Sequence, residues 1–241
     1  MKPKDYPALA RKLTSYWGSW PVSRPIEVGD IGIVNSAGAF VRVTDLGKIP
    51  QLPKPAISSR QSALYDMSSQ HVDVQFGVKA AAGAQAAEAR AKITFSHAGS
   101  ALIILDRPTY RQVRDITMLK RQILALLDDG WEQDWIVVVE TVSADGVTVL
   151  VSGERNAAIE FGVSAQPGGL LLGDLAKAGI DLAVRHRKRI GMAAFGEKGT
   201  PLYRTLRVRK TFLGRTQAEL SGGTAVPNEA FEDVPLPDMD T

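Results

Sequence analysis

The residue types that most often carry chemistry in proteins are few in this chain. It has three histidines, His71, His97 and His186, and no cysteine. A disulfide, a thiolate metal site and a cysteine nucleophile are therefore excluded, and no acidic residue stands at metal-ligand spacing from a histidine. His71 and His97 fall on neighbouring predicted strands, where they could approach each other. We expect exposed strand residues here and no metal site.

Other catalytic signatures are also missing. Residues 196–200, Gly-Glu-Lys-Gly-Thr, lack the G-x-x-x-x-G-K-[ST] spacing and the strand-to-helix context of a phosphate-binding loop. The sequence contains neither G-x-S-x-G nor H-E-x-x-H. The carboxylates of Asp128 and Asp129 follow a predicted helix and need no catalytic explanation. The sequence predicts a protein that is not an enzyme and uses no cofactor.

The largest charge feature is basic and lies late in the chain. It is the run 185–189 together with Arg204, Arg207, Arg209, Lys210 and Arg215. The candidate contact residues in it are Arg185, Arg187, Lys188, Arg189, Arg207, Arg209 and Lys210. Such a group can bind anionic lipid headgroups or nucleic acid, or it can be an ordinary solvated surface. Only Tyr203 and Phe212 lie nearby to stack on bases, which disfavours single-stranded nucleic acid.

Charge and composition divide the chain into a body, 1–215, and a tail, 216–241. The formal net charge is +3, but the tail has six acidic residues and no lysine or arginine, so the body alone carries about +9. The N-terminus lacks the apolar stretch of a secretory signal, and no run of eighteen apolar residues occurs. We expect a soluble, cytoplasmic body and an extended, proline-containing tail.

The apolar spacing predicts an α+β fold with a twisted, mainly antiparallel sheet of long strands and a few packed helices. Helices are expected over 5–17, over 109–128 with Thr109 as N-cap, and from Leu172 into the basic run at Arg185. Residues 48–67 are expected to be irregular. Turns are predicted at Asp145-Gly146 and at 153–156. Strands are predicted within 26–46 as a hairpin and over 71–79, 89–96, 101–105, 135–140, 147–151, 157–163 and 202–208.

Three stretches together resemble one protein family. They are the strand pair 71–79 and 89–96 with its small-residue link, the run 135–142 followed by 146–152 and 157–163, and Gly-Thr-Pro-Leu-Tyr at 199–203. Their patterns and order are similar to those of the bacterial gasdermins, which form membrane pores. The resemblance extends over about residues 70–215, and its motifs are strand patterns without catalytic spacing.

The resemblance implies a pore-forming effector of bacterial antiphage defence. In that family a short C-terminal peptide keeps the protein inactive, a partner protease removes it, and the body forms a homo-oligomer in the inner membrane. Two strand pairs would lengthen into transmembrane hairpins, and closure into a ring would satisfy their backbone groups. The membrane-inserting residues implied are Val72, Val74, Phe76, Val78, Ile93, Phe95, Val147, Val149, Ile159 and Phe161.

The tail then has an inhibitory role. Its acids would lie against the basic body, and Phe231, Val234 and Leu236 would be its apolar anchors. The chain departs from the family in lacking a lipidated N-terminal cysteine and in its predicted opening helix. The alternative is a non-catalytic binding module whose basic surface recruits lipid, nucleic acid or a partner protein, with the tail as a solubilising segment.

Overall fold

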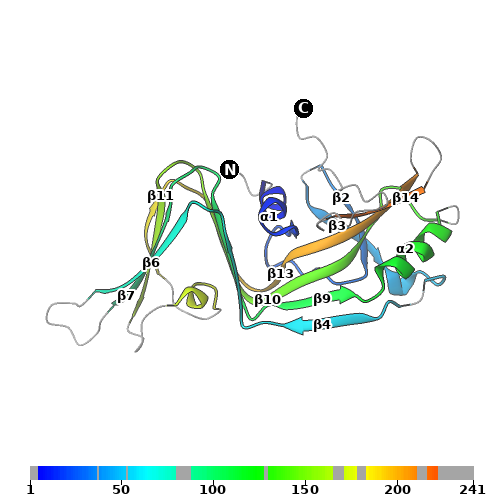
Figure 1. Cartoon of the computed structure of the whole chain (residues 1–241), viewed down its shortest axis with the longest axis horizontal. Helices are drawn as coiled ribbons and strands as arrows, with labels where there is room; N and C mark the ends of the chain where they lie inside the picture. Colours follow the sequence, from blue (N-terminus) through cyan, green and yellow to red (C-terminus); the bar gives the residue numbers. More distant parts are fainter. Residues whose placement is uncertain are drawn as a thin grey trace. The chain divides into compact units, whose positions relative to one another are not determined.

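A computed structural model describes residues 5–36, 38–52, 54–79, 88–127, 130–164, 171–177, 183–210 and 216–221 (Figure 1). Within these ranges, two α-helices accompany strands that pair in antiparallel fashion, which confirms the predicted α+β class with a mainly antiparallel sheet. Neither helix in this part of the chain combines the length and hydrophobicity of a membrane span. The residues group into two compact units, joined by the long strands β10 (Ile136–Ser152) and β13 (Ile190–Lys210).

Unit 2 takes its described residues from Lys4–Gln61, Thr109–Ser143 and Thr200–Thr241. Its sheet runs in the order β1-β13-β10-β2-β3, with β9 beside β10, β4 beside β9 and β14 beside β13. Besides parts of β10 and β13 it contains α1 (Tyr6–Thr14), β1 (Trp17–Gly18), β2 (Asp30–Val34), β3 (Phe40–Asp45), η2 (Leu46–Lys48), β4 (Ile57–Gln61), β9 (Thr109–Val113), α2 (Ile116–Ala125) and β14 (Thr216–Ser221).

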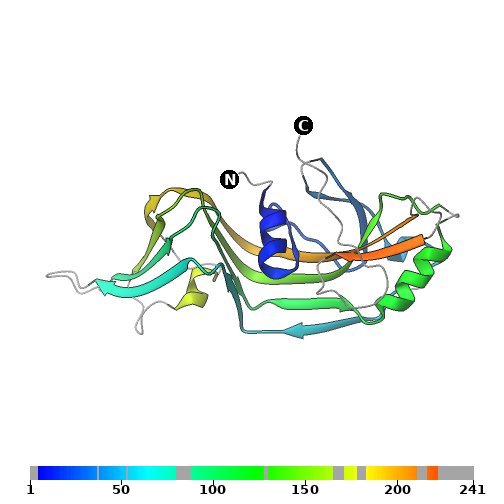
Figure 2. The same cartoon turned by 45° about the horizontal axis from the view of Figure 1, so that its top comes forward.

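Alternating residues of β10 build the two faces of the unit 2 sheet. Val137 and Val139 pack in one apolar cluster with Leu119 and Ile123 of α2. Residues 136 and 138 belong to a second cluster, which includes Trp17 of β1, and the Arg11 guanidinium of α1 lies 4.5 Å from the Trp17 ring centroid. The helices therefore cover opposite faces of the sheet (Figure 2). Successive residues of this stretch of β10 point to opposite faces of the sheet, and both faces are covered. The sequence of the stretch is therefore continuously apolar.

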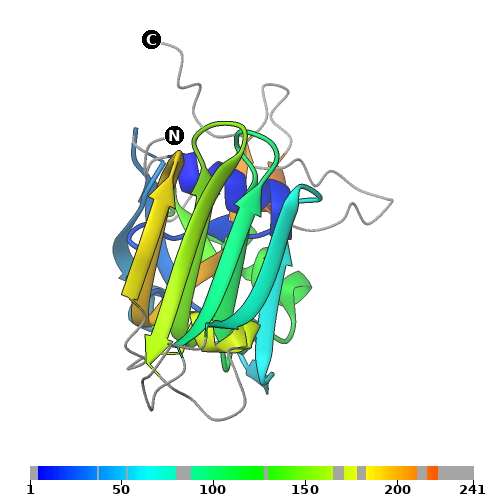
Figure 3. The same ribbon diagram turned by 90° about the vertical axis from the view of Figure 1, so that its left-hand side faces the viewer.

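Unit 1 takes its described residues from Ser62–Pro108 and Ala144–Gly199. One sheet has four strands in the order β12-β11-β7-β6 (Figure 3), and we call it sheet B. Facing it are β5, β8 and the second half of β10. The elements of unit 1 are β5 (Leu64–Ser68), β6 (Val72–Lys79), β7 (Glu88–Phe95), β8 (Ala101–Asp106), β11 (Ala157–Ser164), η3 (Leu172–Leu175) and β12 (Ala183–Lys188).

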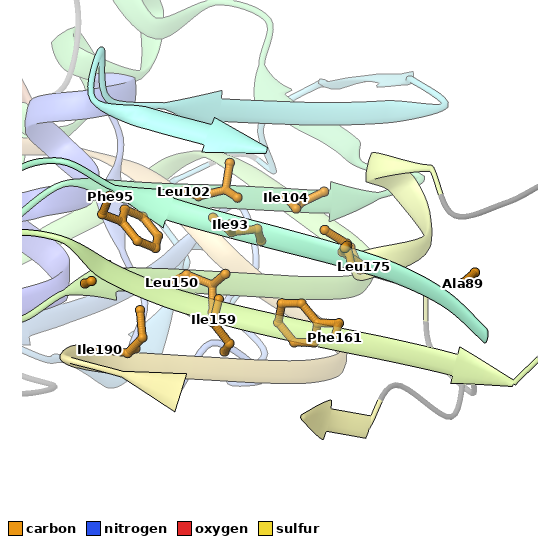
Figure 4. Close-up of a cluster of buried hydrophobic side chains, with 13 residues drawn as sticks. Ala89, Ile93, Phe95, Leu102, Ile104, Leu150, Ile159, Phe161, Leu175 and Ile190 are labelled. Carbon is orange, nitrogen blue, oxygen red and sulfur yellow. The ribbon is translucent and has the colours of Figure 1, made fainter. Parts of the chain in front are cut away.

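The core of unit 1 lies between these two layers (Figure 4). Ile93 and Phe95 of β7 and Ile159 and Phe161 of β11 point into it from sheet B, and Leu150 of β10 meets them from the facing layer. All five side chains are at most 1% exposed. This packing holds sheet B in place through the burial of apolar surface.

Several predicted elements are confirmed. The opening helix is α1, the hairpin is β2–β3, and the strands at 71–79, 89–96 and 101–105 are β6, β7 and β8. The turn at 153–156 is also present, between β10 and β11. The predicted strand at 202–208 is the end of the much longer β13.

The predicted helix over 109–128 was wrong in its first half. Residues 109–113 form β9, which lies between β4 and β10. The helix α2 begins at Ile116, where the Asp115 carboxylate accepts a hydrogen bond of 2.7 Å from the backbone N–H of Met118. Asp115, rather than Thr109, is therefore the N-cap.

Three other expectations were wrong because tertiary pairing overrides local turn and helix signals. Asp145-Gly146 is not a turn, because Gly146 pairs with Asp106 and β10 continues through it. The predicted irregular stretch 48–67 contains β4 and β5. Where the third helix was predicted, the structure has η3 and then β12, which pairs with β11, and residues 178–182 between them lie outside the described part of the chain.

Candidate functional site

The candidate site is sheet B, because it contains most of the residues predicted to insert into a membrane. The pair β6–β7 predicted from the sequence is confirmed, with Val74 opposite Ile93 and Phe76 opposite Ala91. On its other side β7 pairs with β11, where Ile93 lies opposite Ile159. Four antiparallel strands thus make one continuous ladder (Figure 3).

The inner face of sheet B is apolar on β6, β7 and β11, whereas on β12 it includes Arg187, opposite Ile159. Its central residues on β7 and β11 are completely buried, whereas Val72 and Val74 on β6 are half-buried. Two apolar side chains toward the edges are open to solvent: Phe76 is 43% exposed and Val184 of β12, opposite Phe161, is 47% exposed. The side chain of Val78 lies outside the described residues.

The outer face of sheet B is polar and charged. One row across the four strands is Gln75, Lys92, Glu160 and His186, and the next is Asp73, Thr94, Ala158 and Lys188. Apart from the half-buried Thr94, Ala158 and Glu160, these side chains are exposed. The strands β6, β7 and β11 are therefore amphipathic through strict alternation, whereas β12 departs from it where its register against β11 shifts.

The second strand pair that the resemblance implied, 146–152 with 157–163, was wrong. Ile159 and Phe161 belong to sheet B, but Val147 and Val149 lie on β10 in the facing layer, opposite Leu105 and Ile103 of β8. The short turn at 153–156 joins the two layers instead of pairing the strands that flank it. The partner of β11 after β7 is β12, so the second strand pair of sheet B is β11–β12.

Part of the predicted basic cluster lies at the end of β12, in unit 1. Arg187, Lys188 and Arg189 are exposed there. The Arg187 guanidinium donates a hydrogen bond of 3.2 Å to the carbonyl of Ile190, and Arg189 forms an ion pair of 3.3 Å with Glu154. This end of sheet B therefore presents basic groups to solvent.

The other predicted basic residues are on β13 or have no described side chain. Arg207, in unit 2, forms an ion pair of 3.1 Å with Asp134. The side chains of Arg185, Arg209 and Lys210 lie outside the described residues, as do the tail residues Phe231, Val234 and Leu236.

His71 and His97 meet, as the sequence suggested. Their ring centroids are 3.8 Å apart, at the end of sheet B where β6 begins and β7 has ended. The Ser96 hydroxyl lies 3.1 Å from Nδ1 of His97. Over the described ranges, no three His, Cys, Asp or Glu side chains form a group that could hold a metal ion.

A polar cluster in unit 2 had no signal in the sequence. The Tyr16 hydroxyl donates a hydrogen bond of 2.5 Å to Glu140 of β10, and Arg204 of β13 forms an ion pair of 3.0 Å with the same carboxylate. The Arg204 guanidinium also lies 4.2 Å from the Tyr16 ring centroid. The three residues fasten the end of α1 to the sheet. Burial, and then the Glu140 carboxylate, raise the pKa of Tyr16 far above its ordinary value.

We expect Tyr16→Phe to change how stability depends on alkaline pH. The folded state raises the pKa of Tyr16 above the unfolded value of 10.0, so its contribution is complete below pH 10 and is lost as pH rises beyond it. In urea unfolding between pH 8 and 11, the free energy of unfolding should fall less steeply with pH for the variant than for the unaltered protein. At pH 8 it should be lower by about 1–2 kcal/mol because the hydrogen bond is missing. Parallel stability curves for the two proteins would contradict this role of Tyr16.

A cavity of about 320 Å³ lies in unit 2 beside β2 and β3. Among its lining side chains, buried Asp30 holds the guanidinium of Arg42 at 2.9 Å, and Arg42 also pairs with Asp45 at 3.1 Å. Burial raises the pKa of Asp30. Arg42 thus pairs with two carboxylates of the cavity wall, and no residue predicted as a site lines this cavity.

No protein family model matches the sequence, and no curated protein matches it either.

Proposed function

We propose that the protein is a pore-forming effector of bacterial antiphage defence. Its C-terminal tail holds it inactive, and a partner protease activates it by removing that tail. The body then forms a homo-oligomer in the inner membrane, with an anionic membrane surface as its target. Strands of sheet B cross the bilayer, so the proposal takes up the likeness to bacterial gasdermins noted in the sequence.

The observation that supports this proposal best is the amphipathic character of sheet B. On β7 and β11 its inner face offers a continuous apolar surface, including Ile93, Phe95, Ile159 and Phe161, and its outer face carries Lys92 among other polar groups. In the free chain the facing layer covers the apolar side. In a bilayer, lipid would cover it instead, and the polar side would face a water-filled lumen.

The strand lengths are close to what a membrane requires. The strands β6, β7 and β11 have 8 residues each, and a tilted transmembrane strand needs about 9–11. One to three further residues per strand would suffice. The sequence between β6 and β7, residues 80–87, consists mostly of alanine and has no charged residue, so it could extend the pair into lipid at little cost.

Charge supports a contact with anionic lipid. Arg187, Lys188 and Arg189 are exposed at the end of β12, where the apolar face of sheet B ends. Basic groups at this position would reach lipid phosphates while the strands extend in the other direction. The five acids of the tail that follow β14 would compete for the same basic groups until that part of the tail is removed.

The proposal is tested by removing the tail. We expect a chain ending at residue 221 to release a trapped dye from liposomes of phosphatidylglycerol and phosphatidylethanolamine, and the full chain to release none. Release from purely phosphatidylcholine liposomes should be much slower, because the basic groups lack anionic partners. If neither chain releases dye nor forms an oligomer on anionic liposomes, the proposal is wrong.

The same basic residues support the second candidate, a non-catalytic binding module. It predicts binding to lipid, nucleic acid or a partner protein without membrane rupture. Nucleic-acid binding that weakens steeply with salt and does not change when the tail is removed would favour it over the pore.

A further inference from the structure

The two edge strands of sheet B, β6 and β12, run in opposite directions. Among the described residues, β6 pairs only with β7 and β12 only with β11. Because the four strands alternate in direction, β6 and β12 run antiparallel to each other. The β12 edge of one copy therefore fits the β6 edge of another in the antiparallel sense used throughout the sheet.

The two edges carry opposite charges in the same row. Asp73 lies opposite Thr94, Thr94 opposite Ala158, and Ala158 opposite Lys188, so Asp73 and Lys188 mark the two ends of one row on the outer face. Both are exposed. When sheets of two copies join without stagger, Lys188 of one copy lies directly opposite Asp73 of the next.

We infer that the partner of each edge is a second copy of this chain, joined β12 to β6 with Lys188 opposite Asp73. The inference rests on the proposed function and specifies the contact between copies and its register. Joining two β12 edges would bring the cationic residues of this strand, Arg187 and Lys188, close to those of the second copy. Like charges opposite each other destabilise strand pairs. The contact is therefore head-to-tail, and it repeats around a ring.

Two features of β12 oppose this contact in the free chain. The register of β11 against β12 shifts between Glu160 and Phe161, which marks a bulge. Arg187 lies opposite Ile159, on the inner face, and is held there by its bond to the Ile190 carbonyl. Bulges and inward-facing charges on edge strands prevent edge-to-edge pairing. Assembly therefore requires β12 to rearrange, as it would on leaving the free chain's core.

Cysteine cross-linking tests the contact directly, because the chain has no native cysteine. Within one copy, three strand spacings put positions 73 and 188 about 14 Å apart, whereas a disulfide requires Cα atoms within about 7 Å. A chain ending at 221 with Asp73→Cys and Lys188→Cys, oxidised on phosphatidylglycerol liposomes, should give a ladder of covalent trimers and larger species. A matched variant, Thr94→Cys with Lys188→Cys, should give no ladder, because β7 is an interior strand.

Charge exchange provides the second test. Asp73→Lys and Lys188→Asp should each slow dye release by the shortened chain about fivefold, because each places like charges at every junction, and the combination should restore it to within about twofold. Cross-linked dimers alone, no cross-linking, or no rescue would overturn the inference while the unaltered shortened chain still releases dye. Failure of that unaltered chain to release dye would instead overturn the proposed function.

Discussion

Replacing Phe76 by lysine should abolish dye release by the chain ending at 221 and leave its fold almost unchanged. Phe76 is 43% exposed, so its loss opens no cavity, and exposed substitutions change stability by about 0.5 kcal/mol. In the proposed pore the same side chain faces lipid, where lysine near the bilayer centre costs about 2–4 kcal/mol in every copy of the ring. Dye release and urea unfolding, measured on the same preparation, separate the two effects.

The matched control is Gln75→Lys on the same strand. Gln75 lies on the outer face, in the row of Lys92 and Glu160, so its lysine would face water in the free chain and in the pore. We expect dye release within about twofold of the unaltered chain for this variant. If Phe76→Lys and Gln75→Lys reduced dye release equally, the two faces of β6 would not differ in their contact with lipid, which would contradict the proposal.

Leu150→Ala should accelerate dye release, in contrast to Phe76→Lys. Leu150 lies on β10 in the layer that faces sheet B, and it is fully buried against that sheet's core (Figure 4). Its truncation should lower the free energy of unfolding by about 2–5 kcal/mol through the cavity it leaves. Since the variant weakens the closed packing without altering the strands that enter lipid, dye release after tail removal should be at least about tenfold faster.

The control for this prediction is Val149→Ala on the same strand. Val149 is as deeply buried, but it alternates to the other face of β10, away from sheet B. It should lower stability without accelerating dye release. Slower release by a folded Leu150→Ala protein, or equal acceleration by both variants, would contradict the idea that sheet B separates from this layer.

The amphipathic strands were predictable because a half-buried sheet imposes period-two alternation on its sequence. The residues 72–79 and 88–95 show that alternation and pair as predicted. The residues 147–151 and 157–163 show similar apolar content, yet they lie in different layers. A short turn between two strands is typical of a hairpin, and only the tertiary packing distinguishes a hairpin from a connection between layers.

Other features depended on contacts that a linear pattern does not contain. The basic run was predicted as the end of a helix, whereas pairing with β11 makes residues 183–188 a strand. Tyr16 and Glu140 are 124 residues apart, and Glu140 and Arg204 are 64 apart. None of the three residues is unusual in its own segment, so no local sequence pattern indicated that their side chains are in contact. The proximity of His71 and His97 was predictable because both lie at the ends of strands that were correctly paired.

The central claim is that sheet B enters the bilayer with its inner, apolar face toward the lipid. Labelling along β6 tests this claim most directly. Single cysteines at positions 72 to 77, each carrying an environment-sensitive fluorophore, would be compared before and after the shortened chain meets phosphatidylglycerol liposomes. We predict that labels at 74 and 76 shift to the emission of a lipid environment, whereas labels at 73 and 75 stay in water. Emission that does not alternate along the strand, or that does not change with liposomes at any position, would contradict the account.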